Sequence, residues 1–406
     1  MELADVPALL ILLGIIAYAV LAGADFGAPI WAVTARGQES ERLAQAGHRS
    51  MAPVWEANHV WLIFVLVICW TAYPEIFGSI FSTLWIPLLL ACLGIIMRAV
   101  GYVAGGVSIN RKVTWLAAAA SLLVPFALGA VIGALVAGNV PPGNAAGDVI
   151  SSWLAPVPIM VGLLLIATSA YLAAVYLAAD ASRRGEDELA DAFGQRALGA
   201  GLLAGLLAIA GLVVLYVDAR SFFDAMVSTN GHDNELGRIC VLASAIAGTA
   251  TLLLISTRRY AQARILAAVA VAAIVVGWGL AQQPEILPGL TIREAAASNE
   301  VIVELLVAVA IGLVLLIPSL YLLYGLVLGG RFDPLAVPEA EGGRPGQELE
   351  PAGRTKMALV AASALLGGLM LFTSDSGARL YIGLALFTCG LVCGIVLLAR
   401  NLVREQ

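Results

Sequence analysis

The stretch APVWEANHVWLIFVLVICW, residues 52–70, begins with polar side chains and continues as an unbroken apolar run. A membrane-spanning helix needs about 20 predominantly apolar residues, and this run is typical of one. Glu56, Asn58 and His59 lie between Trp55 and Trp61 where the run starts. An ionisable side chain inside a span costs at least about 2.5 kcal/mol, so these groups indicate either a function or a structural partner.

The composition of the whole chain also indicates a membrane protein. Hydrophobic residues make up 61% of its 406 residues, charged residues make up 12%, and the mean hydropathy is +0.93. A soluble domain carries about 25% charged residues. The net charge of −6 gives no sign of a nucleic-acid partner. We therefore expect an all-α polytopic membrane protein.

Apolar segments of membrane-spanning length recur along the chain and predict about eleven transmembrane helices. These segments cover residues 7–33, 53–73, 79–103, 113–138, 153–179, 197–217, 236–257, 260–281, 301–328, 357–374 and 378–400. The first nine are interpreted as two four-helix bundles plus an extra helix, and the last two as a C-terminal hairpin. Residues 331–356 are rich in Pro, Gly and Glu and are expected to form a flexible linker. The predicted domains are thus 1–330, the linker 331–356 and the hairpin 357–406.

Basic residues follow the odd-numbered spans, whereas the loops after spans two and four contain no Lys or Arg. Cytoplasmic loops carry the excess of Lys and Arg, so the N-terminus is expected outside and the C-terminus in the cytoplasm. The basic residues of the odd loops are Arg36, Arg42, Arg49, Arg111, Lys112, Arg183, Arg184, Arg196, Arg258, Arg259, Arg264, Arg331, Arg344, Arg354 and Lys356.

Four ionisable groups within the first three spans form the candidate site. Asp25, Glu56, His59 and Arg98 all fall in the cytoplasmic half of the predicted topology, and Glu56 and His59 share a helix face. A functional interpretation is a proton path from the cytoplasm. A structural interpretation is an ion pair of Arg98 with Asp25 or Glu56, and spacing alone slightly favours it.

The tryptophans of the opening stretch allow two interpretations as well. Trp55 and Trp61 could shield the polar cluster, although the position of both near a span end favours membrane-interface residues.

The chain lacks the residues that a redox centre of its own would need. It contains three histidines, and only His59 falls in a predicted span, so it cannot hold several haems by bis-histidine ligation. The five cysteines form no CxxC pair, so no metal site is predicted. The sequence also contains no P-loop motif for binding phosphate.

Several motifs resemble subunit II of the cytochrome bd-type quinol oxidases. They are GADFGAP (23–29), RSMAPVWEANHVWLI (49–63), AYPEIFG (72–78) and IMRAVGYV (96–103), with weaker similarity in QQPEILPGLTIREAAAS (282–298) and LIPSLYLLYGLV (316–327). The resemblance covers about residues 1–330. Glu56 stands where the family has Asp, and His59 stands where Glu or Gln is usual. With two spans beyond the family's nine, the chain resembles a divergent branch.

The resemblance implies a multi-pass subunit of the bacterial cytoplasmic membrane in a respiratory quinol oxidase. It implies a haem-bearing subunit I as partner, with haems b and d, which oxidises quinol and reduces O₂ to water. It allows a small accessory single-span subunit and a structural quinone or lipid on the apolar surface. This chain would bind no haem and would offer a proton route through Asp25, Glu56 and His59, with Arg98, Trp55, Asn58 and Trp61 as structural partners.

The alternative is a stand-alone ion-coupled membrane transporter in which the same acids couple ions to a solute. Broken helices near the midplane and inverted repeats are typical of such proteins. Neither is clear in the sequence, which favours the oxidase subunit.

Overall fold

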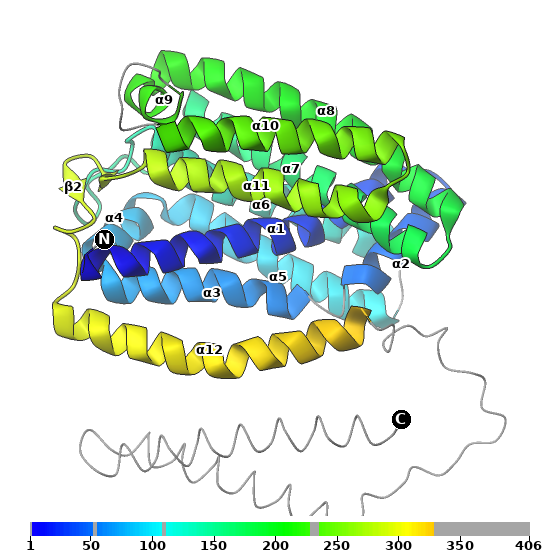
Figure 1. Cartoon of the computed structure of the whole chain (residues 1–406), viewed down its shortest axis with the longest axis horizontal. Coiled ribbons are helices and arrows are strands. Elements are labelled where there is room, and N and C mark those ends of the chain that lie inside the picture. Colours follow the sequence, from blue (N-terminus) through cyan, green and yellow to red (C-terminus); the bar gives the residue numbers. More distant parts are fainter. Residues whose placement is uncertain (1, 52–54, 108–110, 228–234, 329–406) are drawn as a thin grey trace, which may run out of the picture. The chain divides into compact units, whose positions relative to one another are not determined.

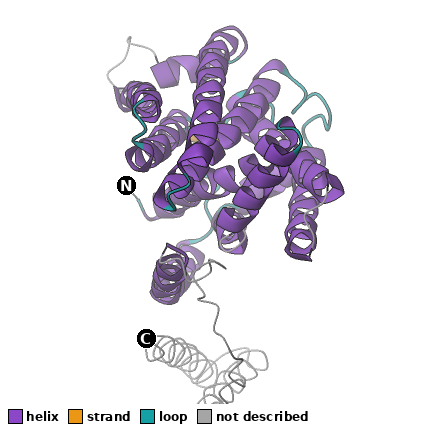
Figure 2. Cartoon of the chain, turned by 90° about the vertical axis from the view of Figure 1, so that its right-hand side faces the viewer, coloured by secondary structure: helices purple, strands orange, loops and turns teal. Residues whose placement is uncertain are grey.

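A computed structural model describes residues 2–51, 55–107, 111–227 and 235–328 of the chain. Almost all of these residues are helical (Figures 1 and 2). The elements are η1 (Leu3–Asp5), α1 (Val6–Thr34), α2 (Gln38–Met51), α3 (Trp55–Ala72), α4 (Pro74–Thr83), α5 (Trp85–Val107), α6 (Arg111–Val136), α7 (Pro156–Arg183), α8 (Asp187–Asp218), α9 (Arg220–Val227), α10 (Glu235–Ser256), α11 (Tyr260–Ala281), β1 (Glu285–Leu287), β2 (Leu290–Thr291) and α12 (Asn299–Leu328). The predicted linker and C-terminal hairpin lie outside the described residues.

The first compact unit, Met1–Val307, contains the two predicted groups of four long helices. Helix α1 packs against α3 and α6, and α5 packs against α6, which forms the first group. In the second group α7 packs against α8 and α11, and α10 packs against α8 and α11. Helix α7 also packs extensively against α1 and α6, and this packing joins the two groups. The helices of both groups thus form one compact unit.

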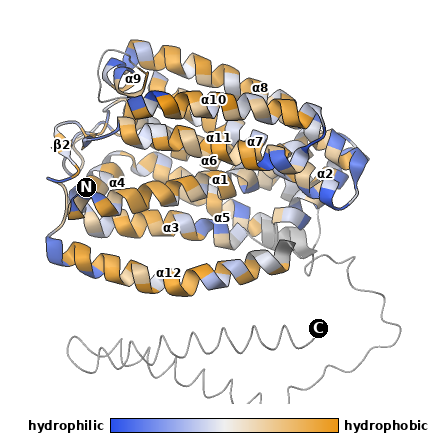
Figure 3. Ribbon diagram, in the orientation of Figure 1, coloured by the Kyte–Doolittle hydropathy of each residue, from blue (hydrophilic) through white to orange (hydrophobic). Residues whose placement is uncertain are grey.

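The described helices have the length and apolar character of membrane spans (Figure 3). Seven of them qualify by length and composition, and the bent pair α3–α4 raises the number to eight. Large apolar side chains such as Leu206, Ile246 and Val314 are more than half exposed, as expected of surfaces that face lipid or another subunit. The prediction of an all-α polytopic membrane protein is confirmed.

One predicted span is wrong at its start. The segment 79–103 was expected to be one helix, but α4 ends at Thr83 and α5 begins at Trp85. Pro87 lacks the N–H group that a continuous helix would donate to the carbonyl of Thr83, and its ring would clash there. Pro74 has the same effect at the end of α3, where the chain bends by 119° into α4.

Small residues allow α1 and α7 to approach closely. A Cβ atom on Gly27 would collide with the main-chain oxygen of Ser169, and one on Gly23 would lie 3.3 Å from the Leu172 side chain. Nearby, the indole N–H of Trp31 donates to the main-chain oxygen of Ala170 at 3.0 Å. Such contacts between small residues are the usual packing of membrane helices, because lipid gives little hydrophobic drive for helix association.

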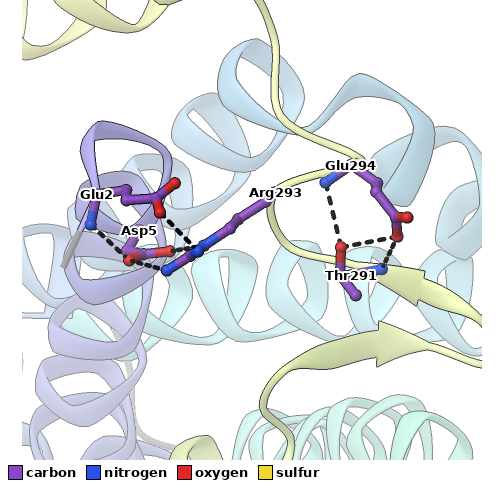
Figure 4. A network of polar contacts seen from close by, with 5 residues as sticks. All are labelled: Glu2, Asp5, Thr291, Arg293 and Glu294. Atoms are coloured by element: carbon purple, nitrogen blue, oxygen red, sulfur yellow. Dashed lines mark hydrogen bonds and ion pairs between the residues drawn. The ribbon is translucent and has the colours of Figure 1, made fainter.

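Polar side chains fasten the first residues of the chain to the segment after α11 (Figure 4). The Arg293 guanidinium donates to Glu2 at 2.7 Å and pairs with Asp5 at 3.4 Å. Beside it, the Thr291 hydroxyl and amide N–H both donate to Glu294. The segment 282–298 is thus held against the start of α1, at the end of the first unit opposite α2 (Figure 1).

Candidate functional site

A buried ion pair joins α1 to α5. The Arg98 guanidinium donates to Asp25 Oδ1 at 2.8 Å and to the main-chain oxygen of Asp25 at 2.7 Å. The Asp25 side chain is 0% exposed and that of Arg98 is 6% exposed, so solvent does not screen this pair. Removing one partner of a buried pair typically costs about 3–5 kcal/mol, because the other charge stays buried. Of the two ion pairs considered from the sequence, the structure shows the one between Arg98 and Asp25.

His59 lies in an aromatic cage formed by Tyr18, Phe26 and Trp55. The ring centroids of these residues lie 6.0, 5.7 and 5.9 Å from that of His59, each in an edge-to-face arrangement. His59 Nδ1 is 2.9 Å from the main-chain oxygen of Trp55. Since a carbonyl oxygen only accepts hydrogen bonds, Nδ1 must carry the proton. Nε2 is buried and has no hydrogen-bond partner among the described residues.

The other two side chains of the opening stretch differ in their surroundings. Asn58 is 2% exposed, and its Nδ2 donates to the main-chain oxygen of Leu21 at 3.4 Å, which ties α3 to α1 beside the ion pair. Trp61 is partly exposed and packs edge-on against Phe64 at 6.2 Å. Trp55, in contrast to Trp61, is in contact with His59.

Glu56 lies in the first turn of α3, three residues before His59. Its side chain is outside the described part of the structure, so its role stays a prediction. Asp25, Asn58, His59 and Arg98 come from α1, α3 and α5 and lie in one region of the first helix group, here called the polar cluster.

Helix α2 adds a residue to this region that the sequence interpretation missed. It is His48, which lies in α2 and is half-buried. Burial, and secondarily the positive charge of Arg98, lowers the pKa of His48. A periodic pattern could have revealed α2, because its buried residues follow helical spacing. They are Leu43, Ala46, Gly47 and Met51.

Ion pairs hold α2 against the turn between α7 and α8. Arg49 donates to both carboxylate oxygens of Glu186 at 2.8 and 2.9 Å. Arg42 pairs with Glu188 at 2.9 Å. A Cβ atom added to Gly47 would lie 3.4 Å from the Ala28 side chain, so α2 lies directly over the part of α1 that carries Asp25. The polar cluster therefore lies beneath a charged surface helix.

Tyr18 and Phe26 were also missed, since an aromatic residue in an apolar run is usually core. No group of three or more His, Cys, Asp or Glu side chains within the described ranges is placed to hold a metal ion.

Comparisons with known proteins bear on the fold and the family of this chain. The family model described as "Cytochrome bd terminal oxidase subunit II" matches residues 3–327. The structure of bd oxidase from Geobacillus thermodenitrificans contains a chain with a TM-score of 0.68 and 13% sequence identity. That match covers 82% of this chain and 99% of the other, and at such low identity it shows the fold alone. A search of the curated proteins found no match. Since the family model covers most of the chain, the protein belongs to the cytochrome bd terminal oxidase subunit II family.

Proposed function

We propose that this chain is the haem-free subunit of a bd-type quinol oxidase and supplies protons from the cytoplasm. Membership of the family makes it a subunit of an oxidoreductase complex. The observation that supports the proton route is the polar cluster, where a buried carboxylate and guanidinium lie beside a partly buried imidazole beneath α2. Buried ionisable groups in membrane helices commonly mark ion or proton pathways. Asp25, Glu56 and His59 would be its titratable members.

The haems would belong to a haem-bearing subunit I, which would oxidise quinol and reduce O₂ to water. This chain does not fit haem ligation, because Nδ1 of its one histidine within the predicted spans is bonded to the Trp55 carbonyl and Nε2 is enclosed by aromatic rings. Its own part would be to support subunit I through exposed apolar helix faces. The same faces could hold a structural quinone, a lipid or a small single-span subunit.

Membership of the oxidase family favours this function over the stand-alone transporter. The two functions predict different behaviour of the isolated chain. A transporter would move solute without a second subunit, whereas an oxidase subunit would need subunit I for its activity.

Glu56→Gln tests the proton route, because it removes a titratable group and little volume. We expect the complex to keep its haems but to turn over more slowly, since a proton carrier that transfers in the rate-limiting step commonly contributes about 100-fold or more. Quinol-driven O₂ uptake, normalised to haem content, measures the effect. Glu304→Gln, in α12, is a matched control. Turnover of Glu56→Gln at the parental rate would remove Glu56 from the route.

The proposed orientation places α2 on the cytoplasmic side of a bacterial inner membrane. Arg42 and Arg49 lie in α2 itself. Arg184 and Arg196 bond to its residues Ser50 and Glu39, so basic side chains gather here as the positive-inside rule requires of a cytoplasmic surface. A membrane-impermeant thiol reagent on intact cells should label Ala146→Cys and leave Gln38→Cys unlabelled until the cells are opened. Both positions are exposed, so the opposite pattern would reverse the topology.

A further inference from the structure

Two buried polar atoms of the histidine cage lack hydrogen-bond partners among the described residues. They are the Tyr18 hydroxyl oxygen and His59 Nε2. The two rings lie 6.0 Å apart between centroids and are nearly perpendicular. Leaving a buried polar atom unpaired typically costs about 1–3 kcal/mol. The two atoms are not bonded to each other in this structure. Since they belong to neighbouring rings, a small rotation of either side chain or a buried water molecule would let them satisfy one another.

The chemistry of the two atoms is complementary. The Trp55 carbonyl fixes the proton of neutral His59 on Nδ1 at 2.9 Å, so Nε2 is left as an acceptor. The Tyr18 hydroxyl is a donor that can also accept. When Nε2 takes up a proton it becomes a donor, and the Tyr18 oxygen can then accept from it. Once joined in this way, the pair would keep its hydrogen bond in both protonation states of His59.

The surroundings also favour a cation on His59. The rings of Phe26 and Trp55 lie edge-to-face with the imidazole at 5.7 and 5.9 Å between centroids. An aromatic ring attracts a positive charge that lies over its face within about 6 Å. Asp25 is close enough to Tyr18 to act on it electrostatically. Arg98 opposes a second positive charge nearby, but Asp25 already balances its charge at 2.8 Å. A proton on His59 would therefore be held reversibly.

We propose that Tyr18 and His59 form a one-proton store beside the proton route. This inference rests on the proposed function. In loading, a proton that the route has delivered to the Asp25 carboxylate passes to the Tyr18 oxygen, directly or through water, while the Tyr18 O–H proton moves to His59 Nε2. Asp25 returns to its carboxylate form. Tyr18 is neutral before and after, and His59 becomes an imidazolium. Because Nδ1 stays bonded to the Trp55 carbonyl, unloading reverses the same path through Nε2. The store therefore feeds the route and is not a through-connection.

The experiment is a double-mutant cycle on the assembled oxidase. Tyr18→Phe removes the hydroxyl and keeps the ring, and His59→Gln removes the titratable nitrogen. Each single variant should slow quinol-driven O₂ uptake and proton uptake by the same factor, with haem content unchanged. If the two residues act as one unit, the double variant should be slowed by no more than that factor. Tyr321→Phe is the matched control, since its side chain is exposed.

Several outcomes would overturn the store. They are parental proton uptake by Tyr18→Phe, unequal single effects, or effects that multiply in the double variant. The failures of the two proposals can be told apart. If Glu56→Gln slows turnover while Tyr18→Phe does not, the store alone is wrong. If Glu56→Gln, Asp25→Asn and Tyr18→Phe all turn over at the parental rate, the proton route itself is wrong.

A high-resolution structure of the complex provides a readout that does not depend on activity. The Tyr18 oxygen and His59 Nε2 should lie within hydrogen-bonding distance of each other or of one shared water molecule. A Tyr18 hydroxyl bonded to any other group would contradict the proposal.

Discussion

The Asp25–Arg98 pair gives Asp25 two roles that a single substitution cannot separate. Its carboxylate would serve as a proton carrier, and it also balances a guanidinium that is 6% exposed. A buried pair is weak evidence for net stability, because desolvation offsets most of its attraction. Loss of one partner is strongly destabilising, because the remaining buried charge is no longer neutralised. The structural role must therefore be restored before the proton role can be measured.

Asp25→Asn and Arg98→Gln are each expected to destabilise the first helix group by about 3–5 kcal/mol. The double variant should recover most of this loss, because no unpaired charge remains. Retention of haem by the detergent-solubilised complex during heating measures the effect. If Asp25 is a proton carrier, the double variant will be stable and still slow. A stable double variant with parental turnover would leave Asp25 a purely structural role.

The sequence predicted which ionisable residues lie in the polar cluster, but it did not predict which acid pairs with Arg98. The cost of burial alone identified Asp25, His59 and Arg98. Spacing could not decide which acid Arg98 contacts, because that depends on how α1 and α5 pack and on the side-chain conformations. Tyr18 carries no signal in an apolar run, and its place beside His59 follows only from the packing of α1 against α3.

The close contact of α1 with α7 explains a motif that could otherwise be taken for a ligand site. Gly27 of GADFGAP faces the main chain of Ser169, with no room for a side chain. Trp31, one turn further, is fixed to the carbonyl of Ala170. This contact holds α1 in place and therefore positions Asp25 against Arg98.

Gly27→Ala is expected to destabilise the subunit by at least about 1–3 kcal/mol, because a Cβ would force α1 away from α7. The control is Gly248→Ala in α10, where an added Cβ meets nothing within 4 Å and the helical propensity improves. Thermal inactivation of the complex compares the two. Equal inactivation temperatures for both variants would show that the α1–α7 contact tolerates expansion.

Elements were predicted where one strong signal governed them. Long apolar runs located the membrane helices, because every backbone polar group in lipid must be bonded within its own helix. The break between α4 and α5 was not located, because Pro87 removes a main-chain hydrogen bond without changing the hydropathy of the segment. Helix α2 was read as a loop because its polar residues outweighed its helical spacing of buried ones.

This chain and the bd oxidase chain from Geobacillus thermodenitrificans share a fold although their sequences differ at most positions. At 13% identity the chain still matches 99% of a bd oxidase chain, so the shared constraints must be few. Span length, loop charge and small residues at helix contacts are sufficient to explain most of them. The sequence also pointed to the family, because the motifs around Asp25, Glu56 and Arg98 resemble those of subunit II. The two predicted C-terminal spans lie outside both the described residues and the part of the chain that the family model matches.

The central claim is that this chain works only as part of a haem-bearing quinol oxidase. The most direct test is to tag the chain, purify it gently from its native membrane, and record a reduced-minus-oxidised spectrum together with quinol-driven O₂ uptake. We predict haem b and haem d bands, a co-purified second subunit and oxygen consumption. A colourless preparation of this chain alone, stable and without oxygen consumption, would contradict the account.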